Sequence, residues 1–507
     1  MKSRFDMHTH GNMLKLKRLG IDTYRENIIF MRSDCHICRS EGFSALTRIK
    51  VQFGSKSIIA TLNVVSSGIL SEGEVILSEI GFSRLGANEG DSITVSHPRP
   101  LHSLSDVRAK MYRRPLDDDG FLRIMQDITD GMYSNIEIAA FISACAGSNL
   151  SLDEIIGLTK AMISTGQKIE WEGKKIMDKH CVGGLPANRT TPIVVSIASA
   201  AGLIIPKTSS RAITSPAGTA DVMETMTSVD LTLDQIRSIV AREGGCLAWG
   251  GSVQLSPADD ILISVERSLD IDSEGQMIAS VLSKKAAAGA THVVIDIPVG
   301  ETSKVRTIEE ASRLEHYFTA VGHSIGLEIK VMITDGSQPV GRGIGPSLEA
   351  MDVLAVLRNE SDAPKDLKER ALRIAGTLLE LSGTCQNGEG YNKAASILEN
   401  GDAFKKFKAI CKAQGRFTEP KFAAYAQEIK ATESGIVKAI DNRRLSRLAK
   451  LAGAPRSATA GIMFLAPLGA KVEQGQTLFV LYAESPGELE YALDYYRTSN
   501  HIIKIES

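Results

Sequence analysis

Two apolar segments with a helical segment between them constrain the fold of this chain most. Residues 291–300 (THVVIDIPVG) and 327–336 (LEIKVMITDG) are short apolar runs that end in glycine, a pattern typical of buried strands. Residues 307–322 between them have helical periodicity, and Thr307 and Glu310 are spaced as a capping box. Strand, helix and strand in this order predict a right-handed crossover in an α/β sheet. We therefore expect a ligand site at the carboxyl ends of the strands.

The chain changes character on both sides of this region. Residues 49–95 alternate apolar and polar side chains, which predicts a small all-β unit that ends near Pro98. Helical periods follow, and Ser151 and Glu154 form a second capping box. From Gly435 onward, short apolar runs with glycine turns predict a compact α+β end domain.

Composition excludes several classes of protein. The 507 residues are 43% hydrophobic and 23% charged with a net charge of -2, which is typical of a globular protein of three or four domains. The near-neutral charge argues against a nucleic-acid binder. We find no apolar run of about 18 residues and no apolar signal core, so we expect neither a membrane span nor export, and a cytoplasmic location.

The seven cysteines are scattered through the chain, which favours reduced thiols over a disulfide framework. Cys35 and Cys38 form one CxxC pair around His36. That pair is compatible with half of a zinc site, but no second pair has matching spacing, so we interpret it as reduced thiols at a turn and expect no metal.

Residues 178–192 (DKHCVGGLPANRTTP) have the composition of an anion site. Lys179 and Arg189 bring charge, the glycine pair lets backbone N–H groups approach a ligand, and two threonines bring hydroxyls. Pro192 suits the first turn of a helix, whose free N–H groups attract phosphate. A strand-to-helix turn with solvated charges explains the segment equally well at this stage.

Four further segments carry polar side chains that suit a phosphate or a sugar. Residues 207–224 combine hydroxyls, Arg211 and two carboxylates around tight turns, and a Ser/Thr-rich surface loop is the alternative. In residues 249–260, Trp249 lies beside two glycines, although a tryptophan is more often part of the core. In residues 266–289, Ser280 and Lys284 share one helix face. Residues 298–306 place Lys304 just after a predicted strand.

Five of these motifs together resemble the thymidine phosphorylase and pyrimidine-nucleoside phosphorylase family. They are DKHCVGG, SSRAITSPAGTADVME, PADD, ASVLSKKAAAG and DGSQPVGRGIGPSLE, in this order. The sequences of these motifs are most similar to those of the branch that contains archaeal AMP phosphorylases and bacterial proteins assigned as thymidine phosphorylases. That branch has a β-rich N-terminal extension.

The resemblance implies an α/β fold class: a helical domain in two segments, a large mixed-sheet α/β domain, a β-rich N-terminal domain and a small α+β C-terminal domain. The implied division is 1–98 for the N-terminal extension, 99–172 and 258–290 for the helical domain, 173–257 and 291–430 for the α/β domain, and 431–507 for the C-terminal domain. It also implies a homodimer or a larger homo-oligomer.

The same resemblance implies the site. Phosphate would contact Lys179, Cys181, Thr190, Ser209 and Thr219. The nucleoside would contact His180, Arg267, Ser280 and Lys284. In the AMP branch, the nucleotide is lined by Gly184, Ser210, Arg211, Ala212, Ile213, Thr214, Ser215, Thr219, Ser280 and Lys304. Asp272 is the implied proton donor, with His180 as a second catalytic candidate.

The implied reaction is phosphorolysis, in which inorganic phosphate is the co-substrate and no cofactor or metal takes part. Cys181 stands where pyrimidine phosphorylases have serine, and the spacing between Arg267 and Asp272 is shorter than theirs. Arg189 replaces an acidic segment and is expected to make the site more cationic, which favours a nucleoside 5′-monophosphate such as AMP. Ala187, where the AMP branch usually has glycine, is a mark against a full match.

Three alternatives stay open. Thymidine is the alternative substrate. Phosphoribosyl transfer on a related fold needs Mg²⁺ on a pyrophosphate, and Asp221 and Glu224 are the imaginable ligands, although we interpret them as a capping and orienting pair. A nucleotide-binding regulator without turnover is the non-enzymatic alternative.

Overall fold

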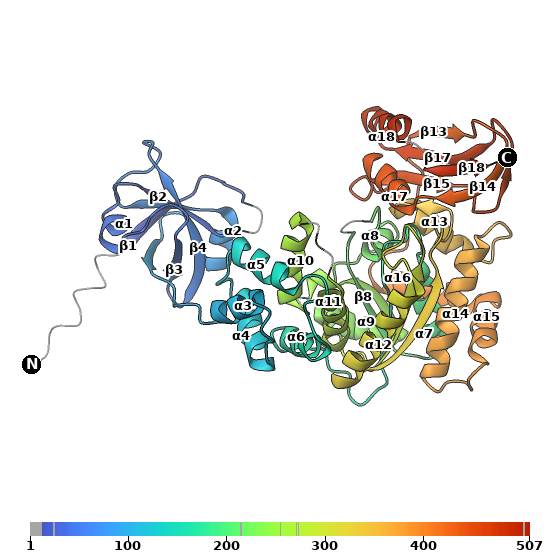
Figure 1. Cartoon of the computed structure of the whole chain (residues 1–507), viewed down its shortest axis with the longest axis horizontal. Coiled ribbons are helices and arrows are strands. Elements are labelled where there is room, and N and C mark those ends of the chain that lie inside the picture. The colour runs from blue at the N-terminus through green and yellow to red at the C-terminus, as the bar shows by residue number, and fades with distance from the viewer. Residues whose placement is uncertain are drawn as a thin grey trace, which may run out of the picture. The chain divides into compact units, whose positions relative to one another are not determined.

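The computed structural model describes residues 13–23, 26–212, 215–253, 255–269, 271, 273–499 and 502–506. Contacts between Cα atoms divide the chain into two compact units, Met1–Tyr112 with Arg123–Phe141 and Arg113–Leu122 with Ile142–Ser507. Figure 1 labels the elements along the chain. Within the described ranges, none of the helices combines the length and the apolar composition that crossing a bilayer requires.

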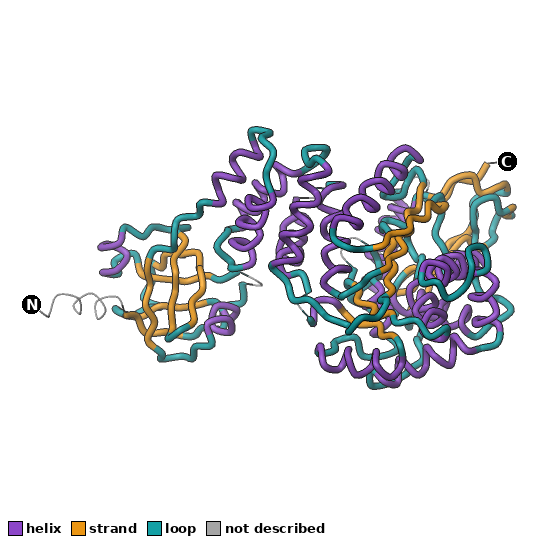
Figure 2. The backbone as a smooth tube through the Cα atoms, turned by 90° about the horizontal axis from the view of Figure 1, so that it is seen from below, coloured by secondary structure: helices purple, strands orange, loops and turns teal. Residues whose placement is uncertain are grey.

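The first unit contains a closed six-stranded barrel with the strand order β1-β5-β2-β4-β3-β6. Figure 2 shows its strands as one compact orange group near the N-terminus. Alternate side chains point inward, as Leu14 and Leu16 do in β1 and Ile29 and Met31 in β2, so half of each strand forms the barrel core. The β-rich N-terminal domain is confirmed, and its first two strands precede the pattern at 49–95. The strands and two short helices are β1 (Met13–Lys17), β2 (Ile28–Arg32), α1 (His36–Glu41), β3 (Arg48–Phe53), β4 (Lys56–Val65), β5 (Glu74–Leu77), α2 (Glu79–Leu85) and β6 (Ser92–Ser96).

Four helices follow the barrel: α3 (Ser103–Met111), α4 (Asp118–Thr129), α5 (Asn135–Cys145) and α6 (Leu152–Ser164). The capping box predicted at the start of α6 is confirmed, because Glu154 N–H donates to Ser151 Oγ at 3.3 Å and Ser151 N–H donates to the Glu154 carboxylate at 3.0 Å. Arg48 of the barrel donates to the carbonyl of Gly131 at 2.8 Å, so the first unit extends into this helical segment.

The second unit is built on parallel strands. The sheet β11-β10-β7 joins the pair β8-β9 through a bridge between Ile176 and Ile204. We expected a mixed sheet, but the described strands of this sheet pair in parallel throughout, because a helix connects each strand to the next. Their carboxyl ends therefore lie on one edge. The strands are β7 (Met177–Cys181), β8 (Ile205–Ser209), β9 (Gly245–Trp249), β10 (His292–Val299) and β11 (Glu328–Asp335).

The crossover predicted from the sequence is confirmed. Helix α12 (Ile308–Ser324) connects β10 to β11, and Thr307 caps it by accepting a hydrogen bond from Glu310 N–H. Strand β10 is buried along almost its whole length, as predicted. Strand β11 is not, because it lies at the edge of the sheet, where alternate residues such as Glu328 and Lys330 meet solvent.

Helices around the sheet form the main core. Helix α7 is apolar on every side, because it packs against α14 and α16, and its Ile193, Val194 and Val195 are fully buried. The helices of this unit are α7 (Thr190–Ala200), α8 (Thr219–Glu224), α9 (Leu233–Glu243), α10 (Pro257–Leu269), α11 (Glu274–Ala287), α13 (Pro346–Leu357), α14 (Lys365–Leu381), α15 (Gly390–Glu399) and α16 (Asp402–Ala413), with a 3-10 turn at Gly250–Ser252.

The C-terminal segment is an α+β structure, as predicted, but it shares a sheet with the α/β region. Strand β12 (Gly343–Ile344), which directly precedes α13, pairs with β15 in the sheet β12-β15-β17-β13, and a second sheet has the order β16-β14-β18. The remaining elements are β13 (Tyr425–Lys430), β14 (Gly435–Ile440), α17 (Asn442–Leu451), β15 (Gly461–Phe464), β16 (Lys471–Val472), β17 (Thr477–Ala483), α18 (Pro486–Thr498) and β18 (Ile503–Glu506). The six-segment division of the chain stays a prediction.

Candidate active site

Polar side chains gather where β7 and β8 end. Lys179, His180 and Cys181 are the last three residues of β7, and Ser209 is the last residue of β8, so the parallel order of the strands brings these predicted site residues to one edge. Ser209 Oγ donates to the Ala248 carbonyl at 3.3 Å on the neighbouring strand.

A buried charge cluster lies beneath this edge. The Asp178 carboxylate is 3.1 Å from Lys207 Nζ and 2.8 Å from Lys285 Nζ, and the three side chains are at most 5% exposed. Burial opposes ionisation of Asp178, but the two ammonium groups hold its pKa below the usual value. Burial and the neighbouring Lys207 lower the pKa of Lys285 to about 7. The cluster ties β7, β8 and α11 together.

His180 lies beside these lysines and is neutral mainly because it is buried. Burial lowers its pKa well below the usual value, and the positive charges of Lys285, Lys207 and Lys179 lower it further. A neutral imidazole donates one hydrogen bond and accepts one. His180 is therefore suited to contact a sugar or a base without carrying a charge.

The segment between β7 and α7 follows a constrained path. Gly184 has φ +88°, and a Cβ there would lie 2.9 Å from the backbone nitrogen of Lys304, so these two predicted residues are in contact and the position requires glycine. Ala187 and Asn188 also have left-handed backbone, with φ 59° and 54°. Asn188 N–H donates to the Val340 carbonyl at 2.8 Å, which anchors the segment to the chain before β12.

Three consecutive residues of this segment, Asn188 to Thr190, each contact a residue that is predicted to bind phosphate. Asn188 Nδ2 donates to Cys181 Sγ at 3.2 Å. Thr190 Oγ1 accepts from Lys179 Nζ at 2.7 Å, deep in the structure, where burial lowers the pKa of Lys179. Arg189, between them, reaches Thr219. The segment therefore organises the candidate phosphate site.

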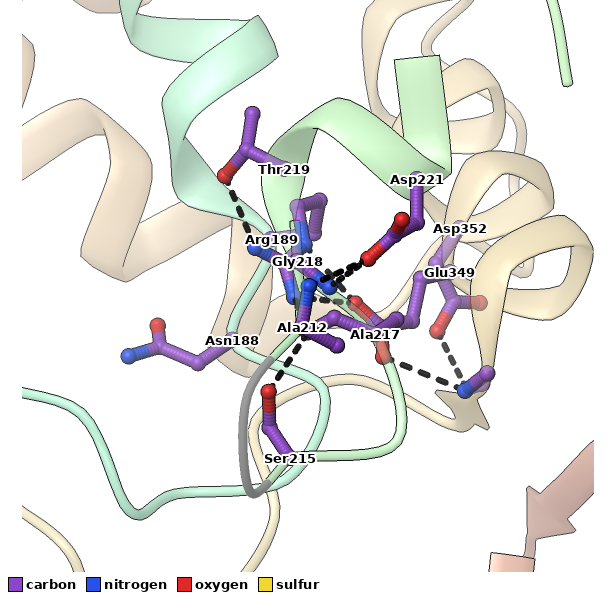
Figure 3. Close-up of polar contacts among 12 residues, drawn as sticks. Asn188, Arg189, Ala212, Ser215, Ala217, Gly218, Thr219, Asp221, Glu349 and Asp352 are labelled. Carbon is purple, nitrogen blue, oxygen red and sulfur yellow. Dashed lines mark hydrogen bonds and ion pairs between the residues drawn. The ribbon is translucent and has the colours of Figure 1, made fainter. Parts of the chain in front are cut away.

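The guanidinium of Arg189 is fully engaged, as Figure 3 shows. Nε donates to Glu349 at 2.7 Å, Nη1 to Thr219 Oγ1 at 2.8 Å and Nη2 to the Ala217 carbonyl at 2.9 Å. The expectation that Arg189 offers its charge to a second phosphate is wrong, because all three guanidinium nitrogens already contact Glu349, Thr219 and the Ala217 carbonyl. Burial raises the pKa of Glu349 to about 7 against the opposing effect of Arg189.

Cys181 is a thiol, not a thiolate, in this setting. Burial and the nearby Asp296 carboxylate raise its pKa far above the usual value. The sulfur accepts a hydrogen bond from Asn188, and the thiol is hydrogen-bonded to the carboxylate of Asp296.

The segment 207–224 is a tight loop that Asp221 holds in place. Its carboxylate accepts hydrogen bonds from Ala212 N–H at 2.6 Å and Gly218 N–H at 2.8 Å (Figure 3). A Cβ on Gly218 would lie 2.5 Å from the Ser210 carbonyl, so the loop closes on itself. Ser215 Oγ donates to the Ala217 carbonyl at 3.0 Å. The interpretation of residues 207–224 as a surface loop is therefore wrong for the part that the Asp221 carboxylate holds in place.

Arg211 stabilises the outer side of the same loop. It pairs with Glu224 and lies 4.9 Å from the ring of Trp249, which is partly buried against the main core. Asp221 and Glu224 thus orient backbone and arginine, and the interpretation of a capping and orienting pair is confirmed. Ile213 and Thr214, predicted to line the nucleotide, lie outside the described residues.

Helix α11 carries the residues predicted to meet the nucleoside. Ser280 is half-buried and Lys284 pairs with Asp259 of α10. Burial alone would lower the pKa of Lys284, but the carboxylate of Asp259 raises it above its usual value. Asp272 and the side chain of Arg267 lie outside the described residues, so their predicted roles stay predictions.

The described part of the chain contains no group of three or more His, Cys, Asp or Glu side chains able to hold a metal ion. Cys35 and Cys38 are both free thiols, and Cys38 is buried in the barrel. Whether the reaction needs a metal or a cofactor is a separate question, and the expectation that it needs neither stays a prediction.

The residues that support the site were not predicted from the sequence. No role was predicted for Asp178, Lys207 or Lys285, and neither Glu349 nor Asp259 was singled out. The adjacent Lys284 and Lys285 were a usable signal, because one helix cannot turn two neighbouring side chains to the same face. Their carboxylate partners are distant in sequence, so only the fold reveals them.

Three family models match the chain. "Glycosyl transferase family, helical bundle domain" matches residues 107–166, "Glycosyl transferase family, a/b domain" matches 173–404, and "Pyrimidine nucleoside phosphorylase C-terminal domain" matches 436–503. The fold is also similar to the crystal structure of anthranilate phosphoribosyltransferase from Thermus thermophilus, with a TM-score of 0.51 and 17% identity over 61% of this chain and 99% of that one.

Two relatives are similar over nearly their whole length. A protein of Hahella chejuensis is 54% identical over 98% of both chains, and one of Polaromonas is 55% identical over 95% of this chain and 94% of its own. Both are named "Putative thymidine phosphorylase". Together with the family models, they identify this chain as a pentosyltransferase that belongs to the glycosyl transferase family of the pyrimidine nucleoside phosphorylase type.

Proposed function

We propose that this pentosyltransferase cleaves the N-glycosidic bond of a nucleoside 5′-monophosphate with inorganic phosphate, releasing the free base and a sugar 1-phosphate. AMP, which would yield adenine and ribose 1,5-bisphosphate, is the first candidate substrate. The observation that carries the proposal is a pair of hydroxyls at the starts of α7 and α8: Thr190 accepts a hydrogen bond from Lys179 and Thr219 accepts one from Arg189, so each hydroxyl directs its own proton elsewhere. An oxyanion is the ligand that such donors suit.

The proposed step is a displacement at the anomeric carbon. The bond from C1′ to the base nitrogen breaks, its electron pair leaves with the base, and a phosphate oxygen forms the new bond to C1′. The transition state has oxocarbenium character, as in glycoside hydrolysis, so the negative charge of the phosphate stabilises it. Most of the rate enhancement would come from holding the phosphate in position and from excluding water from the site.

The departing base needs a proton or a strong hydrogen bond. His180 is neutral, because burial and nearby lysines lower its pKa, so it can donate an N–H hydrogen bond to the base. Asp272, the candidate proton donor, would be identified by Asp272→Asn, which should abolish most turnover and leave phosphate binding intact. Unchanged turnover in that variant would remove Asp272 from the mechanism.

The choice between AMP and thymidine rests on two separate observations. The contact between Gly184 and the exposed Lys304 supports a nucleotide, because that lysine stands beside the candidate site at the end of β10. The relatives named as thymidine phosphorylases favour thymidine as the second candidate. Arg189, engaged by Glu349, no longer argues for either.

The deciding experiment is chromatographic detection of free base from AMP, CMP, UMP, uridine and thymidine, each with and without inorganic phosphate. Adenine released only from AMP with phosphate supports the first candidate, and thymine from thymidine the second. No release from any substrate would leave a nucleotide-binding regulator. Activity should persist in EDTA, since no pyrophosphate has to be neutralised; loss of activity would favour phosphoribosyl transfer.

A further inference from the structure

The side chain of Arg189 is nearly buried, and each nitrogen of its guanidinium makes a polar contact. Its three nitrogens contact Glu349, Thr219 and the Ala217 carbonyl at 2.7–2.9 Å, and the side chain is 13% exposed. A planar guanidinium held at every nitrogen cannot rotate without losing several hydrogen bonds at once. Arg189 is therefore a rigid link rather than a free cation.

Glu349 anchors this link to a second part of the chain. Its side chain is 1% exposed on α13, and its other carboxylate oxygen accepts from Gly345 N–H at 3.1 Å. Figure 3 shows Glu349 between Arg189 and the backbone that precedes α13. The link thus runs from α13 through two side chains to Thr219.

The consequence for Thr219 is chemical. A hydroxyl has one proton, and because Arg189 donates to this oxygen, the Thr219 proton cannot point back at the guanidinium. In the described part of the chain the hydroxyl has no acceptor of its own, and the neighbouring Ala217 carbonyl already accepts hydrogen bonds from Arg189 and Ser215. Thr219 is left as an oriented donor.

We propose that the Arg189–Glu349 ion pair is a positioning device that sets the Thr219 hydroxyl to donate to the attacking phosphate. The inference rests on the proposed function for the identity of the anion. It also explains why an arginine stands in this segment although a buried carboxylate neutralises it. Glu349 reaches Thr219 through Arg189, and Arg189 contacts Thr219 directly, so the pair acts on the phosphate through Thr219.

Binding of inorganic phosphate by calorimetry tests the proposal independently of turnover. Arg189→Lys and Glu349→Gln keep much of the local volume but disrupt the contacts of the guanidinium with Glu349 and Thr219. Each variant should weaken phosphate binding about 10-fold, which is the effect of one hydrogen bond to an ionised group. In turnover assays the KM for phosphate should rise more than the KM for the nucleotide substrate. Thr219→Val should have the same effect, and Arg189→Lys should add little to it.

Arg342→Met is the matched control. Arg342 also pairs with a buried carboxylate of α13, Asp352 at 3.4 Å, but it contacts none of the candidate phosphate ligands. It should change neither KM. Because breaking a partly buried ion pair also lowers stability, the melting temperature of each variant is measured alongside. The inference requires the Arg189 and Glu349 variants to bind phosphate more weakly than Arg342→Met does at a comparable melting temperature.

The outcomes separate this inference from the proposed function. Variants at Arg189 and Glu349 that bind phosphate as wild type does overturn the inference, whatever base release shows. Equal increases in both KM values, matched by Arg342→Met, would reduce the pair to a structural role and also overturn it. Wild type that binds phosphate but releases no base contradicts only the proposed function. Wild type that does neither contradicts both.

Discussion

At the scale of single residues, the site depends on side chains whose protonation or backbone differs from the ordinary. His180 is neutral although it lies among lysines, Cys181 stays a thiol, and Ala187 has a left-handed backbone. Each is a consequence of burial against particular neighbours. Their properties can be measured one at a time.

The first prediction concerns pH. The unfolded chain has a histidine pKa of about 6.5, and that of His180 is lower in the folded protein, so the unfolded state binds more protons below that pH. The stabilising contribution of neutral His180 is full above pH ~6.5 and is lost as pH falls towards the folded pKa. Urea unfolding of wild type should lose more stability between pH 7.5 and pH 5.5 than that of His180→Asn. An equal loss in both proteins would show that His180 titrates normally.

The second prediction concerns Ala187, which is 6% exposed with φ 59°. A β-branched side chain is strained in this conformation, so Ala187→Val should lower the free energy of unfolding by about 2 kcal/mol. Ala187→Gly, the residue common in the AMP branch, should change it by less than about 1 kcal/mol, because glycine accepts the conformation but loses more entropy on folding. Chemical denaturation of both variants checks the order, and a stable Ala187→Val would contradict it.

At the scale of elements, Asp178 connects the parts that carry the two halves of the site. Lys207 lies on β8, two residues before Ser209, and Lys285 lies on α11, beside Lys284. One buried carboxylate thus joins the phosphate side to the predicted nucleoside side. Removing one partner from a buried ion pair strongly destabilises the protein, because the other charge stays buried without a partner.

Asp178→Asn tests this connection. Removing the carboxylate leaves Lys207 and Lys285 buried together without a counter-charge, and the free energy of unfolding should fall by about 3–5 kcal/mol at neutral pH. Burial and Lys207 already lower the pKa of Lys285 to about 7, and without Asp178 it falls further below the unfolded value of about 10.4. The unfolded state then binds more protons than the folded state, so stability should recover as pH rises towards 9. Lys285→Met, which keeps the Asp178–Lys207 pair at 3.1 Å, is the milder control. A pH-independent loss would point to packing instead.

At the scale of the whole molecule, the second unit joins the C-terminal segment to the α/β region through β12 and β15. A Cβ on Gly461 would lie 2.1 Å from the Ile344 carbonyl, and one on Gly345 would lie 2.4 Å from the Ala460 carbonyl. The strands therefore approach each other where only hydrogen fits. Because α13 with Glu349 begins directly after β12, this contact supports the candidate phosphate site from a distance.

Gly461→Ala tests that support. The added methyl group has to displace backbone, so stability should fall by more than about 2 kcal/mol, and phosphate binding should weaken as α13 shifts. Gly487→Ala is the matched control, because a Cβ there meets nothing within 4 Å and the residue lies in helix α18. It should be neutral or stabilising. Normal phosphate binding by a destabilised Gly461→Ala would separate the C-terminal segment from the site.

Local patterns were enough to predict many elements. The capping box at Ser151 and the first hydrogen bond of the one at Thr307 occur as expected, because these interactions join residues only three apart. The crossover between β10 and β11 follows from apolar periodicity and handedness. That all the described strand pairs of this sheet are parallel, and that β11 forms its exposed edge, did not follow, since an apolar run does not reveal which strand ends the sheet.

The sequence by itself determined which residues are candidates for the site: Lys179, His180, Cys181 and Ser209 stand at strand ends that parallel pairing brings to one edge, and Thr219 begins the helix after β8. Tertiary structure alone decided what those residues can do. The charge of Arg189 reads as free in the sequence and is neutralised by Glu349, 160 residues away along the chain. Burial and distant partners set protonation and hydrogen-bond direction, and neither is written in local sequence.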